Sequence, residues 1–590
     1  MTLPVRFSKD QDNIVTLTLN SEGQRVNTLN DEMRDSLVAT IERLVREKDS
    51  IAGVIFASAK STFFAGGDLN YLYQLKAEDA DQLFEQISIV KRAFRQLETL
   101  GKPVVAAING SAVGGGFELA LACHYRICIA DPKIQLGLPE ATLGLLPGLG
   151  GVVRMNLLLG LIESQSYLQE GRLFNPQHGF KAGLVDQLVA DSDELMRVAR
   201  AWILSGPEAV QPWDRESYLV PGGRPGAPEL QTWIATATAA LRTKPQACYP
   251  APGIILSCSI AGMSVDFEQA DLIETRGFIE LVTGSVAKNL LGTFWFQLNS
   301  LKAGAERPEG IAPKRFSKIV LSGSDAIRDE VVALLGSRRI ETVAAGVSFD
   351  VKDVQVCADA QLRVAVGPED LVLRATMLPI SGQPEDTVGL HFFSPLQRTP
   401  LVEILEGHET SPQTLAHALD FVLQLGKIPL VVRDGAQFFT RRLQSCYVRE
   451  GQALLADGQD ISLIEEGARV AGFTKPPSVG HSDVPPAASA HLTSGPLALQ
   501  EVVDRLLFCL AFEAVHMLNE EQLRHVSAGN IGSVMGVGYP RWTGGVFQFL
   551  NQYGLSKAVE RGQTLATLYG ERFNPPSLLI EKAQRKELFN

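Results

Sequence analysis

The pattern of apolar and polar positions divides the first third of the chain into short strands and longer helices. Alternation of β-branched and polar residues predicts a half-buried strand, and continuous apolar runs are typical of strands buried on both faces. By these criteria, strands are predicted at residues 14–20, 51–57 and 103–109. Helices are predicted from Asn30, whose side chain can cap a helix, and across residues 80–100. Strands that alternate with helices to about residue 190 indicate an α/β layered domain.

The middle of the chain interrupts this pattern, and the α/β alternation then returns. Residues 205–230 are rich in proline, glycine and polar residues, which is typical of a linker, and residues 254–303 have a helical pattern. Further strands are predicted at residues 316–321, 354–358, 362–366, 370–375, 388–393 and 428–432. Beyond residue 437 the pattern is helical, except for a long loop rich in proline, serine and alanine at residues 472–496.

Composition narrows the classes of protein that the sequence can encode. Apolar residues make up 45% and charged residues 20% of the 590 residues, which predicts several soluble folded domains. The net charge of −12 argues against nucleic acid or an anionic membrane as partner, because both require clustered positive charge. We see no transmembrane run and no leader peptide, and we expect a cytoplasmic protein. The seven cysteines are scattered without a CxxC pair, which predicts reduced thiols and no metal site.

Two glycine-rich segments carry the strongest chemical signal. The segment NGSAVGGGFELALA ends a predicted strand in three glycines and opens a helix with Glu118 in its first turn. The segment STFFAGGDL follows another buried strand and contains Ala65, Gly66, Gly67 and Asp68. Glycines let a ligand approach the backbone closely, and a helix N-terminus offers unpaired N–H donors to a developing oxyanion. Two donors from separate loops would bind one carbonyl oxygen and stabilise its enolate.

A second carboxylate, Glu140, lies in the segment GLPEATLGLLPGLGG. Paired carboxylates beside an oxyanion hole can divide acid and base work on one water molecule. Taken alone, the glycines could equally serve tight packing, and Glu118 could be a favourable charge in the first turn of a helix. Taken together, the segments favour the chemical interpretation.

These segments resemble the signature of the crotonase superfamily of enoyl-CoA hydratases and isomerases. The resemblance implies a ββα-spiral fold in which Glu118 and Glu140 are the catalytic pair. It also implies that the N–H groups of Ala65 and Gly115 form the oxyanion hole for the thioester oxygen. The residues implied to contact the acyl-CoA substrate are Ala65, Gly66, Gly67, Asp68 and Gly115. The segment RVNTLN and the loop through Asp68 match the CoA-adenine region of the superfamily. Both carboxylates are present, which favours hydration, since isomerases of the superfamily can work with one.

The rest of the chain resembles the α subunits of multifunctional fatty-acid oxidation enzymes. The segments ACYPAPGIILSCSIAG and SVAKNLLGTFWFQLNSL are similar to the linking helices of that family, although Gln297 stands where an Asp is common. Residues 389–407 resemble the hallmark of the 3-hydroxyacyl-CoA dehydrogenase part. The resemblance implies an α/β chain in four parts. These are a crotonase domain at 1–200, a linker with linking helices at 201–312, a truncated Rossmann-like dehydrogenase domain at 313–434 and all-helical dehydrogenase-like domains at 435–590.

The dehydrogenase part departs from this family at its cofactor fingerprint. A dinucleotide site needs G-x-G-x-x-G after the first strand, but Ser322, Ser324 and Ile327 stand at the three glycine positions. Only Gly323 remains in this turn, and Asp325 adds negative charge where phosphates would lie. We therefore expect this part not to bind NAD.

The residues that match the catalytic set of the dehydrogenase are also altered. His391 and Glu403 match the acid–base histidine of the family and its carboxylate partner. However, Arg441 corresponds to the substrate-binding asparagine, and the serine of the family falls near Thr376. Without an electron acceptor, His391 and Glu403 are expected to be vestigial residues in a structural module.

The sequence therefore predicts an enoyl-CoA hydratase of fatty-acid β-oxidation that needs no cofactor and has Δ3–Δ2 isomerisation as a side activity. Three alternatives stay open. They are a bifunctional hydratase–dehydrogenase, another crotonase reaction such as thioester hydrolysis or C–C cleavage, and a largely non-catalytic scaffold for a thiolase. The partners implied by family analogy are a second copy of the chain and a thiolase β subunit, besides the acyl-CoA substrate.

Overall fold

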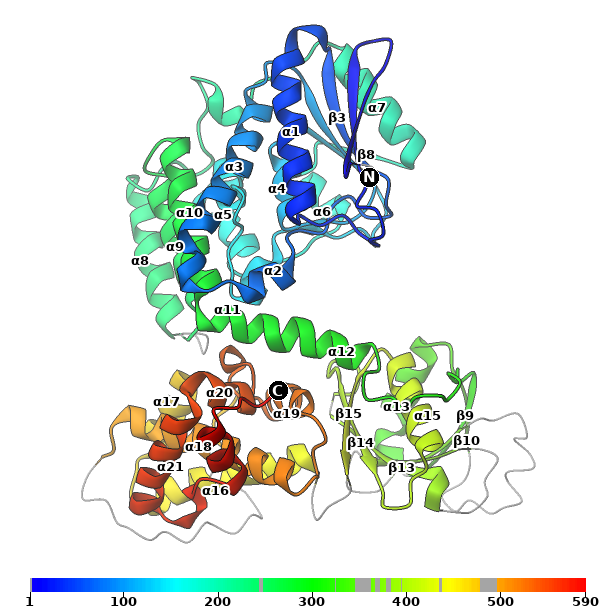
Figure 1. Cartoon of the computed structure of the whole chain (residues 1–590), viewed down its shortest axis with the longest axis vertical. Coiled ribbons are helices and arrows are strands. Elements are labelled where there is room, and N and C mark those ends of the chain that lie inside the picture. The colour runs from blue at the N-terminus through cyan, green and yellow to red at the C-terminus, as the bar shows by residue number, and fades with distance from the viewer. Residues whose placement is uncertain are drawn as a thin grey trace. The chain divides into compact units, whose positions relative to one another are not determined.

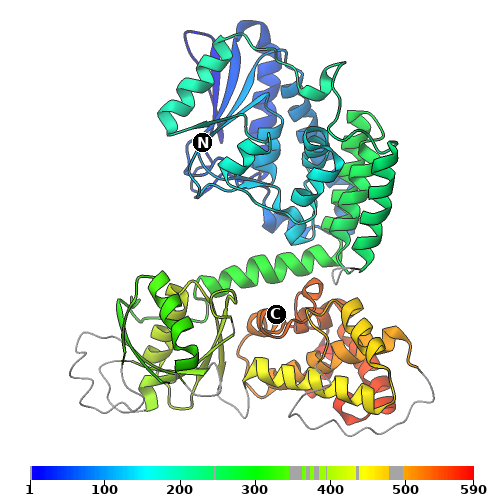
Figure 2. The same ribbon diagram turned by 180° about the vertical axis from the view of Figure 1, so that it is seen from behind.

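The computed structural model describes residues 3–243, 248–323, 325–344, 362–366, 372–377, 384–393, 395–433, 438–477 and 496–590. The chain forms two compact units, Met1–Leu291 and Gly292–Asn590, which Figures 1 and 2 show from opposite sides. The first unit extends well beyond residue 200, because helices of the predicted linker pack into its core.

A six-stranded sheet is the frame of the first unit. Its strands lie in the order β1 (Val5–Lys9), β2 (Ile14–Leu19), β3 (Gly53–Ser58), β4 (Val104–Ile108), β6 (Tyr125–Ile129) and β8 (Gln187–Val189). The pair β1–β2 is antiparallel, and every later pair of neighbours is parallel. The three strands predicted in this part correspond to β2, β3 and β4. Because these strands run parallel, their carboxyl ends lie at the same end of the sheet, where loops can build a site.

Both faces of this sheet are buried under helices. Successive side chains of a strand point to opposite faces, so they pack against different helices. Ile55 of β3 packs with α7 (Ser192–Leu204), whereas Val54 and Phe56 belong to the main core with α1 (Asp31–Glu47) and α3 (Ala80–Glu98). The side chain of Asn30 accepts from Met33 N at 2.9 Å, which confirms the predicted cap of α1. The remaining elements before α7 are η1 (Lys48–Ser50), α2 (Leu69–Gln74), η2 (Ala77–Asp79), β5 (Ala112–Val113), α4 (Gly115–Leu121), β7 (Leu136–Gly137), η3 (Pro139–Leu143), α5 (Gly151–Leu168) and α6 (Pro176–Lys181).

The linking segment contributes helices to the first unit. These are α8 (Pro228–Thr243), α9 (Pro250–Gly262), α10 (Phe267–Thr283) and α11 (Ser285–Leu290), and Figure 1 shows α9 and α10 beside α3 and α5. Ile255 of α9 and Phe278 of α10 are buried in the same core as α1 and α3. A Cβ atom on Gly277 would lie 2.7 Å from Cys258 Sγ, so this glycine allows α9 and α10 to approach closely. Residues of α10 can therefore reach the region of α5.

The second unit contains α12 (Leu298–Lys302) and a mixed seven-stranded sheet. The strand order is β10 (Glu341–Ala344), β9 (Lys318–Gly323), β11 (Leu362–Val366), β12 (Val372–Met377), β13 (Thr387–Phe392), β14 (Leu401–Glu406) and β15 (Ile428–Arg433). Only β10–β9–β11 at one edge and β14–β15 at the other are parallel. This partial doubly wound pattern confirms the predicted truncated Rossmann-like domain. The strand predicted at residues 354–358 lies outside the described residues.

Helices complete the second unit and confirm the predicted all-helical end of the chain. After α13 (Asp325–Ser337) and α15 (Pro412–Gln424), they are α16 (Phe439–Ala456), α17 (Ile461–Ala471), α18 (Leu499–Asn519), α19 (Val526–Gly532), α20 (Val546–Tyr553), α21 (Leu555–Tyr569) and α22 (Ser577–Arg585). Arg505, buried on α18, pairs with Glu450 at 2.6 Å and with Asp457 at 2.8 Å. Most of the loop predicted at 472–496 lies outside the described residues.

Candidate active site

The glycines of the segment NGSAVGGGFELALA lie in a tight turn between β5 and α4 and in the first turn of α4. Gly114 has a φ of +54°, and a Cβ atom there would lie 2.7 Å from Glu140 Oε1. A Cβ atom on Gly116 would lie 2.3 Å from the carbonyl oxygen of Phe64, which belongs to the segment STFFAGGDL, the first glycine loop along the chain. Any side chain at these positions would separate the two segments, so glycine is required by close approach. The structure thus brings both predicted segments together with Glu140.

The backbone N–H of Ala65, which was predicted as an oxyanion donor, is already engaged. It donates to the carbonyl oxygen of Asn27 at 2.8 Å. Ala65 is therefore unavailable as a donor, which corrects that prediction. The next carbonyl, that of Gly66, accepts from Leu29 N at 2.8 Å. Because the C=O and N–H of a trans peptide point in opposite directions, the N–H of Gly67 points away from Leu29.

Gly67 and Gly115 are among the residues whose N–H groups remain available where the two loops meet. A Cβ atom on Gly66 would lie 3.8 Å from Gly115 N, so the loops touch at this point. In the part of the chain that the structure describes, neither Gly67 N–H nor Gly115 N–H has a protein acceptor. Gly115 is the first residue of α4, where N–H groups lack intrahelical partners. The arrangement provides two donors from separate loops, with Gly67 in the place predicted for Ala65.

Asp68 and Asn27 hold the first glycine loop in place. The Asp68 carboxylate caps α2, since it accepts from Asn70 N at 2.9 Å and from Tyr71 N at 3.4 Å. The fully buried Asn27 side chain accepts from Ser21 N at 2.9 Å and donates to the hydroxyl of Ser58 at 2.9 Å. Both side chains have a structural role in this loop, and contact of Asp68 with substrate stays a prediction.

Glu118 is fully buried on α4, and its carboxylate is held by the backbone. Its Oε1 accepts from Leu149 N at 2.7 Å and from Gly151 N at 2.8 Å. Burial raises the pKa of Glu118 well above its ordinary value, and the charge of Glu140 raises it further. A Cβ atom on Gly151 would lie 2.8 Å from this oxygen, so a glycine is needed where the carboxylate meets the turn. A carboxyl group with a raised pKa can hold or release a proton near neutral pH.

Glu140 is placed beside Glu118 by the short helix η3. Its Oε2 is buried and has no hydrogen-bond partner among the described residues. Burial raises the pKa of Glu140 to about 7, with a further contribution from the charge of Glu274. A buried carboxylate oxygen without a partner is costly in an ordinary core and is typical of a site that meets a ligand or water.

Glu274 on α10 is a third carboxylate at this site, and the sequence analysis missed it. It is buried, accepts from Gly150 N at 2.6 Å and Val153 N at 3.1 Å, and pairs with Lys91 at 2.9 Å. Its charge raises the pKa of both Glu118 and Glu140. The signal that could have revealed it is a glutamate on the apolar face of a helix, one turn before Phe278.

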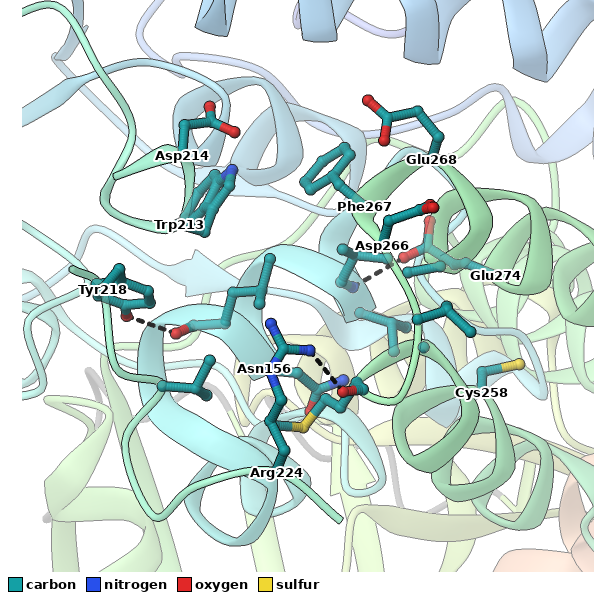
Figure 3. A pocket seen from close by; sticks show the side chains of 18 of the residues that line it. Asn156, Trp213, Asp214, Tyr218, Arg224, Cys258, Asp266, Phe267, Glu268 and Glu274 are labelled. Carbon is teal, nitrogen blue, oxygen red and sulfur yellow. Dashed lines mark hydrogen bonds between the residues drawn. The ribbon is translucent and has the colours of Figure 1, made fainter. Parts of the chain in front are cut away.

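A cavity of about 310 Å³ lies beside the first turns of α5, among α9, α10 and the segment with Trp213 and Tyr218. Figure 3 shows Glu274 in its wall, directed toward the start of α5. None of the predicted site residues lines this cavity. The cavity is therefore distinct from the meeting point of the glycine loops.

In the second unit, the structure brings His391 and Glu403 together as predicted. They lie directly opposite each other on β13 and β14, with His391 Nδ1 at 3.0 Å from Glu403 Oε2. Thr440 Oγ1 donates to the same carboxylate at 2.7 Å. The ring of His391 stacks on Phe438 with 5.1 Å between centroids. The dyad is thus well ordered, and Arg441, which follows Thr440, is exposed.

The strand–turn–helix where a dinucleotide would bind runs from β9, which ends at Gly323, to α13, which begins at Asp325. Ser324, between them, lies outside the described residues. The family fingerprint places glycines in this turn to approach the pyrophosphate and at the helix packing position. The residues present here do not fit that requirement.

Among the described residues, no group of three or more histidine, cysteine, aspartate or glutamate side chains is arranged to hold a metal ion. No described helix is both long and apolar enough to cross a membrane.

Comparisons with known proteins match both parts of the chain. Residues 9–209 match the enoyl-CoA hydratase/isomerase family, and residues 373–435 match the NAD-binding domain of 3-hydroxyacyl-CoA dehydrogenase. The fatty acid oxidation complex subunit alpha of Shewanella sp. strain MR-4 is 28% identical over an alignment of 712 positions, gaps included, which covers 99% of this chain and 99% of the relative. That of Shewanella baltica strain OS185 is 27% identical over 710 residues, with the same coverage. The crystal structure of human mitochondrial delta3-delta2-enoyl-CoA isomerase is 21% identical, covers 50% of this chain and 98% of its own, and has a TM-score of 0.37.

The two family matches fall on the two sheets. The hydratase/isomerase match contains Glu118, Glu140 and both glycine loops. The NAD-binding match begins only at residue 373, so it contains His391 and Glu403 but not the turn after β9. The chain is therefore an enzyme in which an enoyl-CoA hydratase/isomerase domain is joined to a 3-hydroxyacyl-CoA dehydrogenase-like part, related over its whole length to the α subunits of fatty acid oxidation complexes.

Proposed function

We propose that the first unit hydrates 2-trans-enoyl-CoA to 3-hydroxyacyl-CoA in fatty-acid β-oxidation. The observation that carries the proposal is the meeting of two buried carboxyl groups, Glu118 and Glu140, with the available N–H groups of Gly67 and Gly115. Carboxyl groups with raised pKa values can exchange protons with water near neutral pH, and the two N–H groups can stabilise an enolate. A scaffold without chemistry would have no use for buried carboxylates of this kind.

The reaction adds one water molecule across the double bond, and the site provides a place for each charge. The thioester oxygen accepts hydrogen bonds from the N–H groups of Gly67 and Gly115. As the water oxygen bonds to C3, the π electrons move toward C2 and the thioester, and an enolate forms. The ionised carboxylate of the pair takes the proton of the water, and the protonated one delivers a proton to C2. By family analogy, delivery to C2 belongs mainly to Glu140.

The same geometry supports Δ3–Δ2 isomerisation as a side activity. The oxyanion donors would stabilise the dienolate formed when a proton leaves C2, and a carboxyl group of the pair would return a proton to C4. No cofactor enters either reaction.

The test is an assay of the pure full-length chain with crotonyl-CoA and a longer enoyl-CoA, with the product identified by mass. The wild type should add one water molecule. Glu118→Gln and Glu140→Gln should each lower kcat about 100- to 10,000-fold, because each removes one partner of the acid–base pair. Glu163→Gln, an exposed glutamate on α5, is the matched control and should leave kcat unchanged. Hydrolysis or cleavage of the thioester instead of hydration would overturn the proposal in favour of another crotonase reaction.

For the second unit, we propose that the dehydrogenase reaction is lost. Ser322, Ser324 and Ile327, which stand where the fingerprint has glycine, and the family match that begins at residue 373 support this proposal. The ordered pair of His391 and Glu403 favours a second candidate, a bifunctional hydratase–dehydrogenase. The two differ in whether NAD⁺ is reduced.

We also propose partners and a finer domain division. The Shewanella relatives are named subunits of a complex, which supports assembly of this chain with a second copy and with a thiolase β subunit. We further propose that the two compact units contain the four predicted parts, 1–200, 201–312, 313–434 and 435–590.

A further inference from the structure

The turn at the start of α5 is shared by two buried carboxylates that reach it from different helices. Glu118 comes from α4 and Glu274 comes from α10. The N–H donors are, in chain order, Leu149 to Glu118, Gly150 to Glu274, Gly151 to Glu118 and Val153 to Glu274. Because the donors alternate along one short stretch of backbone, a movement of either carboxylate displaces the groups that hold the other.

Lys91 on α3 holds Glu274 in this position. Its ammonium group is buried and lies 2.9 Å from Glu274 Oε1 and 3.2 Å from Asp271 Oδ1. It also donates to Thr275 Oγ1 at 2.8 Å and to the carbonyl oxygen of Asp271 at 2.8 Å. All these partners lie on α10, so a single buried lysine ties α3 to the helix that carries Glu274. A buried charge pair with this many hydrogen bonds is well defined in geometry.

We propose that Glu274, held by Lys91, is a positioning residue for Glu118. It fixes the turn whose N–H groups orient the Glu118 carboxylate toward the reacting water. The inference rests on the proposed hydration at Glu118 and Glu140. Both carboxylate oxygens of Glu274 accept hydrogen bonds from the turn, and one of them also pairs with Lys91. Glu274 therefore acts on the substrate through Glu118 and through its own charge.

Glu274 also acts on the catalytic pair through its charge. Titratable and charged groups face it from the elements packed around it. They are Lys91 on α3, Glu118 on α4, Glu140 on η3, Arg154 on α5, Cys258 on α9 and Asp271 on α10. The negative charge of Glu274 raises the pKa of both Glu118 and Glu140. Removal of this charge should therefore lower both pKa values. Removal of Lys91 should raise the pKa of Glu274 itself, and a protonated Glu274 no longer carries this charge.

The test is the pH profile of hydration by the full chain, with crotonyl-CoA as substrate. Glu274→Gln should lower kcat about 10- to 100-fold and change KM less than about threefold, because the loss is in orientation and not in binding. Its kcat profile should move to lower pH. Lys91→Met removes the cation that keeps Glu274 ionised, so Glu274 should take up a proton and the profile should again move to lower pH. A shift of the pH profile is not expected from a general loss of stability.

Two further variants separate positioning from folding. Lys91→Met/Glu274→Gln removes both charges of the pair together, and the other acidic partner of Lys91, Asp271, has a side chain that is 21% exposed. It should fold even where a single variant does not, and it should keep the low kcat of Glu274→Gln. Glu450→Gln, which removes a buried glutamate paired with Arg505 in the second unit, is the matched control. It should lower the Tm without moving the pH profile of hydration.

The outcomes distinguish this inference from the proposed function. If the wild type hydrates and the double variant has a normal kcat and pH profile, Glu274 is a structural residue and only this inference is overturned. If the wild type does not hydrate enoyl-CoA, the proposed function is overturned and the inference falls with it. A shift of both single variants to lower pH that Glu450→Gln does not show, or a low kcat of a stable double variant, supports the positioning role.

Discussion

At the scale of single residues, the site combines carboxyl groups that would be more stable apart. Burial raises the pKa of Glu118, Glu140 and Glu274, and Glu274 adds to the shift of the other two. Only Glu274 has a buried cation beside it, Lys91. Keeping ionisable groups in such surroundings costs folding free energy, which is expected where the groups do chemistry.

This cost gives a prediction for Glu140. Its pKa is about 7 in the folded chain, against an ordinary value of 4.5. Between these values the unfolded chain loses its proton first, so the wild type loses stability as the pH rises through this range. Glu140→Gln cannot ionise, so it should be more stable than the wild type at about pH 8, by up to about 3 kcal/mol. The difference should vanish near pH 4. Denaturant unfolding at both pH values measures it, and an equal difference at both would contradict the raised pKa.

Residue by residue, sequence reasoning reached what local motifs encode. Glu118 and Glu140 stand inside glycine-rich segments whose composition already indicates close backbone approach. The error at Ala65 has a different origin, because its N–H is occupied by a carbonyl of Asn27 from another loop. Glu274 was missed because its role depends on α10 folding against α5, a contact that no local pattern records. Which N–H groups are free is a tertiary property.

At the scale of elements, the first glycine loop depends on how α2 begins. Asp68 caps this short helix. Asp68→Ala should therefore lower the free energy of unfolding by about 1 kcal/mol, whereas Asp68→Asn keeps an acceptor and should cost only a few tenths. The same pair of variants tests contact with substrate. If Asp68 acts only as a cap, the KM for enoyl-CoA should be unchanged in Asp68→Asn, and a large rise in KM would show that its charge contacts the substrate.

Elements with a strong apolar pattern were predictable, and those without one were not. β2, β3 and β4 have alternating or continuous apolar residues, and their predicted ranges match within a few positions. β1, with the sequence VRFSK, was missed because three of its five residues are polar and it pairs at the edge of the sheet. The residues of β14 were assigned to the dehydrogenase hallmark at 389–407 and were not predicted as a strand. Its pairing with β13 is what places Glu403 opposite His391.

At the scale of the whole molecule, the linking helices belong to the catalytic part. The first compact unit runs to Leu291, and its core includes residues of α9 and α10. A family match that ends at residue 209 therefore leaves out Glu274, although its carboxylate contacts the same turn as Glu118. Composition could identify residues 205–230 as a linker, but it could not show that the helices after it complete the first core.

The second unit leads to the last prediction, which concerns NAD⁺. A dinucleotide needs a glycine-rich turn after the first strand, and here Ser322, Ser324 and Ile327 stand where the fingerprint has glycine. The full chain should therefore form no NADH from 3-hydroxyacyl-CoA and NAD⁺, although His391 and Glu403 remain in contact. NAD⁺ should also leave the Tm unchanged, whereas a ligand at 100 times its Kd adds about 2.7 kcal/mol of stability. An acyl-CoA ligand of the first unit is the positive control for the thermal shift. Either NADH formation or a higher Tm with NAD⁺ would show that the turn without these glycines still binds the cofactor, and His391 and Glu403 would then be working catalytic residues.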